Sequence, residues 1–398
     1  MSTNTLRVPF SRPALGTEEE AAVLRVMRSG WITTGSETLL FEKEFAQALA
    51  PHGTGNIPPV QAFAVNSASS GLMLAYDACG VGPGTKILTT PYTFISTATS
   101  ALHLGAEVVY ADIEADTYNI DPEQIRRKLA ADPAIRAVVP VHIAGNVCRM
   151  EEICSIARSA GVTVIEDAAH AFPSCVHGVY AGTFADAGVF SFYATKTITT
   201  AEGGMVCTRN EEIAKRIQLM RMHGIDRPVW DRYTSPKPSW QYDIAAAGWK
   251  CNLPDILSAI GREQLKKAHQ FLEQRTAIVQ AYNRAFEQYD CFTLPPDSPG
   301  NAHHLYILRI RPDKLTIGRD EFAAKLMERG VGVSVHFIPH FHMSYICGRY
   351  GITAHDFPNA QRQYERSLTL PLWPGMTEEM VSHVTAAVTA LGKEYYAG

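Results

Sequence analysis

Residues 164–170 read VIEDAAH, a short apolar run that ends abruptly in two acidic residues. A β-branched run of this length is typical of a strand buried inside a parallel sheet. The carboxyl ends of such strands are where open α/β sheets bind their ligands, so Asp167 is a candidate site residue. Taken alone, however, an aspartate here is more simply explained as a helix cap at a strand-to-helix turn.

The sequence around this run alternates short β-branched stretches with helical spacing from about residue 60 to 210. This alternation predicts an α/β fold with a mostly parallel sheet and crossover helices. Asp121 followed by Pro122 predicts the start of one helix, because aspartate caps free N–H groups and proline fits the first helical position. The expected strands are residues 86–88, 107–112, 136–142, 162–166 and 187–192.

The rest of the chain predicts a second, smaller unit. Residues 225–248 combine three prolines with Trp230, Tyr233 and Trp240 and show no period, which indicates a long loop that is functional or covers another subunit. Helical spacing returns from about 255 to 289, and later segments predict strands at 305–310 and 331–337 and helices at 320–329 and 378–391. We therefore expect a large domain over residues 15–262 and a small C-terminal α+β domain over residues 263–398, with residues 1–14 packed against the small domain.

The composition excludes several classes of protein. Of the 398 residues, 46% are hydrophobic and 19% are charged, and the formal net charge is -4. The basic residues are scattered along the chain, so we expect neither a nucleic acid nor a membrane surface as partner. The eight cysteines form no C-x-x-C pair, and no window approaches the ~18 apolar residues of a membrane span, so a cytoplasmic location is expected.

A second informative stretch, residues 190–204, reads FSFYATKTITTAEGG. Its only lysine, Lys196, lies among small hydroxyl and aromatic residues, so partial desolvation should lower its pKa and free the amine for imine formation. The alternative is a surface lysine on a polar loop. The order Asp167, Ser191, Lys196 along the chain favours a reactive lysine.

Two further turns could hold parts of a ligand. Residues 65–72 read VNSASSGL and lead into a helix, whose first N–H groups and serine hydroxyls could hold a phosphate. A simple serine cap is the alternative. Phe94, at the next strand-to-helix turn, could stack on an aromatic ligand or pack in the core.

Taken together, these stretches resemble the DegT/StrS sugar-nucleotide aminotransferases, which belong to the fold-type I enzymes that depend on pyridoxal 5'-phosphate (PLP). This resemblance implies a large domain built on a seven-stranded, mostly parallel sheet, and a PLP cofactor that passes through pyridoxamine 5'-phosphate. The ordered motifs that carry the resemblance span nearly the whole chain: Ser67–Ser69, Gly82–Gly84, Thr93–Phe94, Pro140–His142, Glu166–His170, Phe190–Phe192, Lys196, Glu202–Gly204, Gly248–Asn252 and Ser367–Pro371.

The resemblance also implies a role for each matching residue. Lys196 resembles the catalytic lysine that holds the cofactor as a Schiff base, and Asp167 resembles the partner of the pyridine nitrogen. His170 matches the position beside the ring hydroxyl, and Phe94 matches the aromatic residue that stacks on the ring. Phosphate contacts are expected from Ala68, Ser69, Ser191 and Asn252.

Two of these matched positions affect how the site would be built. Asn252 is expected to reach the phosphate of a neighbouring subunit, which implies a homodimer with shared active sites. The turn Ser67-Ala68-Ser69 departs from the usual Ser-Gly-Thr, and Ala68 would fit poorly if its backbone needed a positive φ.

The implied reaction moves an amino group from an amino acid, glutamate by analogy, to the keto group of a nucleotide-linked keto-deoxy sugar. The alternatives are a PLP- or pyridoxamine phosphate-dependent sugar dehydratase, a keto-cyclitol aminotransferase and a non-catalytic regulatory homologue. Lys196 argues against the dehydratases that resemble this family, which carry histidine there. His336, His340 and His342 have no acidic residue nearby, so no metal site is expected and no role is assigned to them.

Overall fold

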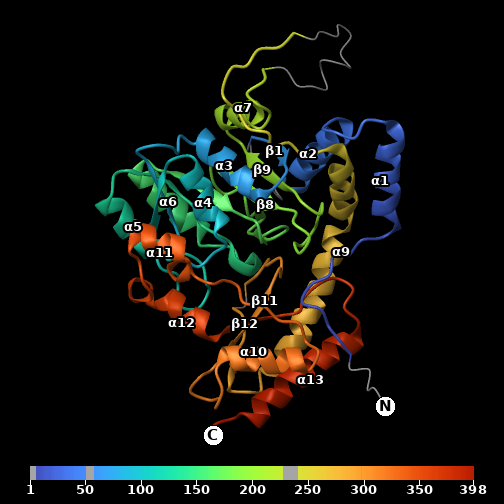
Figure 1. Ribbon diagram of the computed structural model, residues 1–398, viewed down its shortest axis with the longest axis vertical. Coiled ribbons are helices and arrows are strands. Elements are labelled where there is room, and N and C mark those ends of the chain that lie inside the picture. The colour runs from blue at the N-terminus through green and yellow to red at the C-terminus, as the bar shows by residue number, and fades with distance from the viewer. Residues whose placement is uncertain (1–5, 51–57, 227–240, 297) are drawn as a thin grey trace.

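The computed structural model describes residues 6–50, 58–226, 241–296 and 298–398. Its largest sheet has seven strands, of which six are parallel to one another and β9 runs in the opposite direction (Figure 1). The α/β fold with a mostly parallel sheet is therefore confirmed. The strand order is β1 (Gln61–Val65), β9 (Gly204–Thr208), β8 (Ala187–Ser191), β5 (Thr163–Asp167), β4 (Ile135–Val138), β2 (Lys86–Thr89) and β3 (Glu107–Tyr110).

Three of the expected strands form within one residue of their predicted ends, and two are shorter than predicted. β3 ends at Tyr110 and not at residue 112, and β4 ends at Val138 and not at residue 142. Pro140 has no N–H to continue the ladder beyond β4. Beyond β4 the main chain pairs with β5 again through an isolated bridge between Val141 and Asp167.

Helices cover the sheet and join its strands (Figure 1). α5 begins as predicted, because the Asp121 side chain accepts a hydrogen bond from the Glu123 N–H at 2.9 Å and Pro122 occupies the first helical position. The helices of this region are α3 (Ala68–Ala78), α4 (Ser96–His103), α5 (Pro122–Ala131), α6 (Met150–Ala160) and α7 (Glu211–Met220), with a short hairpin of β6 (Cys175–Val176) and β7 (Val179–Tyr180).

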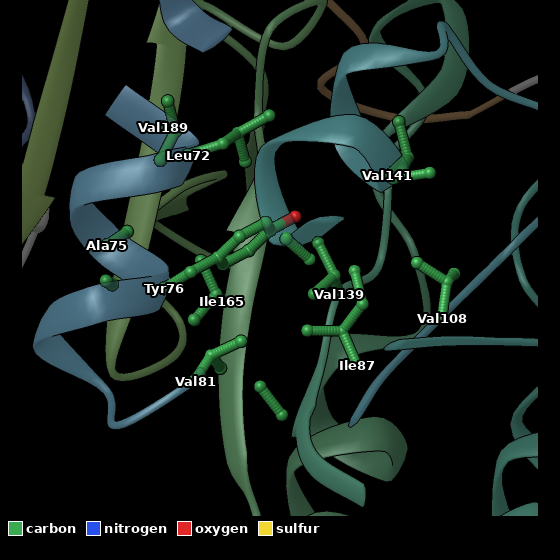
Figure 2. Packing of buried hydrophobic residues seen from close by; sticks show 14 of the residues in the cluster. Leu72, Ala75, Tyr76, Val81, Ile87, Val108, Val139, Val141, Ile165 and Val189 are labelled. Atoms are coloured by element: carbon green, nitrogen blue, oxygen red, sulfur yellow. The ribbon is translucent and has the colours of Figure 1, made fainter. Parts of the chain in front are cut away.

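Tyr76 is at the centre of the largest core cluster. Figure 2 shows its ring between α3 and the sheet, close to Ile165 of β5 and Val139. The whole side chain is buried, so its hydroxyl must find a partner inside the protein. It donates a hydrogen bond to the main-chain oxygen of Thr97 at 2.9 Å, which links α3 to α4.

The C-terminal part of the chain forms a second core cluster around a three-stranded antiparallel sheet. Val8 joins this cluster and pairs with Val331. The elements are β10 (Phe292–Thr293), β11 (Tyr306–Ile310), β12 (Ser367–Leu370), α10 (Arg319–Glu328) and α13 (Glu378–Glu394). Two further helices, α11 (Ser344–Tyr350) and α12 (Pro358–Arg366), pack instead on the large cluster through Ile346 and Ala360.

The strand predicted at residues 331–337 is wrong. Only two isolated bridges occur there, from Val331 to Val8 and from Ser334 to Thr369. His336 and Phe337 instead line the main cavity of the protein. Of these seven residues only Val331 is buried, so the alternating apolar pattern did not correspond to a paired, buried strand.

The long helix α9 (Asp255–Phe286) runs past both clusters (Figure 1). Phe271 packs with the large-sheet residues and Ile278 with the C-terminal cluster, and the predicted boundary at 262/263 lies inside this helix and stays a prediction. α1 (Thr17–Ser29) and α2 (Ser36–Ala48) pack along its first half. No helix among the described residues is long and apolar enough to cross a membrane.

Candidate active site

A cavity of about 360 Å³ lies at the carboxyl ends of β5 and β8. One wall comes from these strand ends and from the turns before α3 and α4. The opposite wall comes from the N-terminal segment and the C-terminal part of the chain, including Phe10, Leu305 and Leu372. Seven of the eight predicted site residues line this cavity: Ala68, Ser69, Phe94, Asp167, His170, Ser191 and Lys196.

Asp167 is the last residue of β5, and its carboxylate is buried. Oδ2 accepts a hydrogen bond from the Thr97 hydroxyl at 2.8 Å, and Oδ1 accepts from the Ala169 N–H at 3.1 Å. Burial raises the pKa of Asp167, and these two hydrogen bonds and the charge of Lys196 oppose that rise. The site thus contains a desolvated carboxylate that faces the cavity, as a partner for a protonated nitrogen requires.

Lys196 follows β8 in a tight turn, with its N–H bonded to the Tyr193 oxygen at 2.9 Å. Burial lowers the pKa of Lys196 to about 8, although the charge of Asp167 works in the opposite direction. A lysine with this pKa has an unprotonated amine in about one molecule in ten at pH 7, against fewer than about one in a thousand for an ordinary lysine. The amine is therefore prepared to act as a nucleophile.

His170 faces the cavity as a neutral ring. Its pKa is held well below the usual value by burial first and by the charge of Lys196 second. The Ala144 N–H donates to Nδ1 at 3.4 Å, so the ring proton is on Nε2. The ring also stacks on Phe337 at 5.5 Å between centroids. His170 can therefore donate one hydrogen bond from Nε2.

The turn at Ser67–Ser69 begins helix α3. The Ser67 hydroxyl caps the helix by accepting from the Ser70 N–H at 3.1 Å, while the N–H groups of Ala68 and Ser69 belong to the first turn, which has no partners inside the helix. Ala68 has a helical backbone, so alanine fits in place of the usual glycine. A Cβ on Gly204 would lie 2.8 Å from the Ala68 nitrogen, which explains why this strand begins with glycine.

Two predicted residues lie at the edge of the site or outside it. Phe94 lines the cavity but is 59% exposed, so it is not a core residue. Asn252 does not line the cavity of its own chain. The Asn252 Nδ2 donates a hydrogen bond at 2.5 Å to the hydroxyl of Thr34, a residue of the loop between α1 and α2. The Asn252 Oδ1 accepts a hydrogen bond from Lys250.

Several cavity residues were not predicted from the sequence. Phe10 stacks on His336 at 5.6 Å between centroids, and the His304 ring lies 4.4 Å from that of His170. Burial lowers the pKa of His304 well below its usual value and that of His336 to about 4, so both rings are neutral. Phe10, His304 and His336 come from distant segments of the chain. Of these three, His336 was noted in the sequence, in the group that also contains His340 and His342.

The other conspicuous polar residues have structural roles. Glu166, the first acid of the VIEDAAH run, is fully buried behind the site and bonded to His142 at 2.9 Å. His340 is also buried, between the Tyr110 hydroxyl and the Thr93 oxygen, each at 3.1 Å. His342 contacts Gln361 at 2.8 Å. Within the described ranges, no three histidine, cysteine or acidic residues are grouped as metal ligands would be.

The fold and this cavity together define a family. Residues 13–389 match the DegT/DnrJ/EryC1/StrS aminotransferase family, and the chain belongs to it. It is 40% identical over 391 residues to the spore coat polysaccharide biosynthesis protein SpsC of Bacillus subtilis, with 97% of each chain covered. It is 42% identical over 390 residues to an uncharacterized protein of Methanocaldococcus jannaschii, covering 97% of this chain and 98% of that one.

Solved structures agree. The PMP form of a putative sugar aminotransferase from Streptococcus pneumoniae superimposes with a TM-score of 0.88, at 27% identity over 98% of each chain. PseC of Helicobacter pylori, an aminotransferase involved in the biosynthesis of pseudoaminic acid, gives a TM-score of 0.87 at 27% identity, with 98% of this chain and 100% of that one covered. The protein is thus an aminotransferase with PLP as its cofactor.

The cavity fits this cofactor. A buried carboxylate, a lysine of lowered pKa and a helix start with free N–H groups line one space of about 360 Å³. These are the groups that a pyridine nitrogen, an aldehyde and a phosphate respectively require.

The lowered pKa of Lys196 predicts how the cofactor-free protein reacts with acetic anhydride. Acetylation of Lys196, followed by mass spectrometry, should accelerate with pH and level off above a midpoint near 8. Lys215, which is exposed and has a raised pKa because of Glu212, should keep accelerating well beyond that pH. Equal pH profiles for the two lysines would contradict a desolvated Lys196.

Proposed function

We propose that the enzyme transfers the amino group of an amino acid, glutamate in the simplest case, to the keto group of a nucleotide-linked keto-deoxy sugar. The observation that carries this proposal is that Lys196 and Asp167 face one cavity from neighbouring strands of the sheet. SpsC, named for polysaccharide biosynthesis, and PseC, named for that of pseudoaminic acid, support a sugar as acceptor.

In this proposal the described residues hold the cofactor at four points. Asp167 pairs with the ring nitrogen, His170 donates from Nε2 to the ring oxygen, and Phe94 stacks on the ring face. Ser191, Ser69 and the Ala68 N–H bind the phosphate. Bound in this way, PLP supplies an electron-poor ring that stabilises negative charge on the carbon next to the transferred nitrogen.

Lys196 is the proposed acid and base of the reaction. When its amine is free, Lys196 can remove a proton from the donor carbon that bears the amino group. It can then return a proton to the cofactor carbon that is bonded to the same nitrogen. Its pKa of about 8 suits both tasks, because the neutral and protonated forms are both populated near neutral pH. A histidine at this position could not bind the cofactor covalently, so Lys196 favours amino transfer over dehydration.

The acceptor side of the cavity suits a ligand of mixed polarity. Phe10, Leu305, Phe337 and Leu372 supply apolar surface, and His336 is a neutral ring whose Nδ1 is held by the Thr369 hydroxyl at 3.0 Å. The long loop predicted at residues 225–248 would help to select the sugar nucleotide, with Trp230, Tyr233 and Trp240 available to line a pocket. These three residues lie outside the described residues.

The reaction can be tested in two halves. The purified holoenzyme with glutamate alone should release about one 2-oxoglutarate per site, and repeated release should require a keto acceptor. Nucleotide-linked keto-deoxy sugars should serve, with the amino sugar detected by mass spectrometry, and a keto-cyclitol should not. Release of no 2-oxoglutarate would contradict the donor, and turnover with the cyclitol alone would contradict the sugar.

Substitutions connect this activity to the two central residues. Lys196→Ala should abolish turnover, and Asp167→Asn should lower kcat by about 10²-fold, because the electrostatic stabilisation of the developing charge is lost. Asp313→Asn, at an exposed carboxylate paired with Arg311, is the matched control and should behave as wild type.

We further propose a homodimer in which Asn252 completes the phosphate site of the neighbouring subunit. Asn252 does not reach its own cavity and is bonded to Thr34 instead. Next to Thr34 in the chain, α1, α2 and their connection expose several large apolar side chains, which suits burial against a second copy. These are Leu24, Met27, Ile32, Leu39 and Leu40.

Hybrid dimers test this arrangement. A dimer of one Lys196→Ala chain and one Asn252→Ala chain, isolated with two affinity tags, should have one complete site and about half of the wild-type activity per dimer. If Asn252 acts within its own chain, neither site is complete, and the hybrid should be no more active than the Asn252→Ala dimer.

A further inference from the structure

Helix α4 contacts the two ends of the proposed cofactor site through side chains that none of the sequence motifs singled out. Thr97, in its first turn, is fully buried and donates its hydroxyl hydrogen to Asp167 Oδ2 at 2.8 Å. Ser100, one turn further on, is also buried and donates to the main-chain oxygen of Ser69 at 3.0 Å. The short helix α4 therefore contacts both the Asp167 carboxylate and the phosphate turn, by which we mean the turn Ser67–Ser69.

The direction of the hydrogen bonds around Thr97 is fixed by chemistry. An ionised carboxylate only accepts, so the Thr97 hydroxyl must be the donor to Asp167. Thr93, whose hydroxyl lies 3.3 Å from that of Thr97, must then donate to Thr97. This chain directs two hydroxyl dipoles toward the Asp167 carboxylate and favours its charged form.

The main chain of α4 is fixed as well. The hydroxyl of Tyr76, a fully buried residue of α3, donates to the Thr97 oxygen at 2.9 Å. α3 is the helix whose first turn contains Ala68 and Ser69. A displacement of α4 would therefore disturb the aspartate and the phosphate turn together.

We propose that α4 positions both ends of the cofactor site, with Thr97 as the positioning residue for Asp167 and Ser100 as that for the Ser67–Ser69 turn. Neither residue takes part in the reaction, because each acts through another group. The proposal rests on the proposed role of Asp167 at the ring nitrogen.

The two residues should be separable by experiment. Thr97→Val keeps the shape of the side chain but removes the donor, so PLP should bind to the cofactor-free protein about tenfold more weakly, as expected for a lost charge-assisted hydrogen bond. The pH midpoint of the visible absorbance band of the holoenzyme should also move upward. A less ionised Asp167 leaves less positive charge on the ring, and the pKa of the group that titrates the band then rises.

Ser100→Ala should weaken PLP binding by about threefold and leave the pH midpoint unchanged, because it acts on the phosphate turn alone. Thr97→Ser restores the hydroxyl and should recover both wild-type values. Thr99→Val is the matched control, because the Thr99 hydroxyl donates to the Ile95 oxygen just before the same helix, away from Asp167 and Ser69, and it should change neither value.

A Thr97→Val protein with the affinity and pH midpoint of wild type would overturn the proposal. If Thr97→Val does not fold, Tyr76→Phe takes its place, since it removes only the hydroxyl that holds the Thr97 oxygen; it should shift both values in the same directions by less, and wild-type values would overturn the proposal. Wild-type protein that shows no visible band with PLP would instead contradict the proposed function itself.

Discussion

The buried carboxylate of Asp167 is the charge on which the rest of the site depends. Moving a carboxylate out of water costs several kcal/mol unless hydrogen bonds and an opposite charge compensate for it. Here Thr97 and Ala169 donate to its two oxygens, and Lys196 supplies the opposite charge. Each of these partners comes from a different element. The carboxyl end of β5, helix α4 and the turn after β8 must therefore all be in place before the carboxylate can be buried.

The same desolvation acts in opposite senses on the groups around Asp167. It raises the pKa of the carboxyl group, lowers that of Lys196 to about 8 and keeps His170 neutral. The cavity therefore combines a desolvated carboxyl group, a reactive amine and a neutral hydrogen-bond donor in one space. Phe10, Leu305 and Leu372 add apolar surface to the lining of this cavity.

Sequence reasoning found the residues whose neighbours in the chain reveal their setting. Asp167 ends a buried run and Lys196 lies among uncharged residues, so local pattern made both of them candidates. Their roles were predicted from the order of the motifs along the chain and from the family resemblance. The roles of Thr97 and Phe10 arise from contacts across the fold, so no local pattern marks them. The strand predicted at residues 331–337 failed for a related reason: the segment makes only isolated bridges, and His336 and Phe337 at its end line the cavity. The roles of the eight residues in holding the cofactor stay predictions.

The most direct test of this account is to locate the cofactor on the chain. The holoenzyme, reduced with borohydride and digested, should show the pyridoxyl phosphate mass on the peptide that contains Lys196 and on no other lysine. The Lys196→Ala protein should show none while still binding PLP reversibly, because Asp167 and the phosphate turn remain. A modified lysine elsewhere, such as Lys250, would contradict the account.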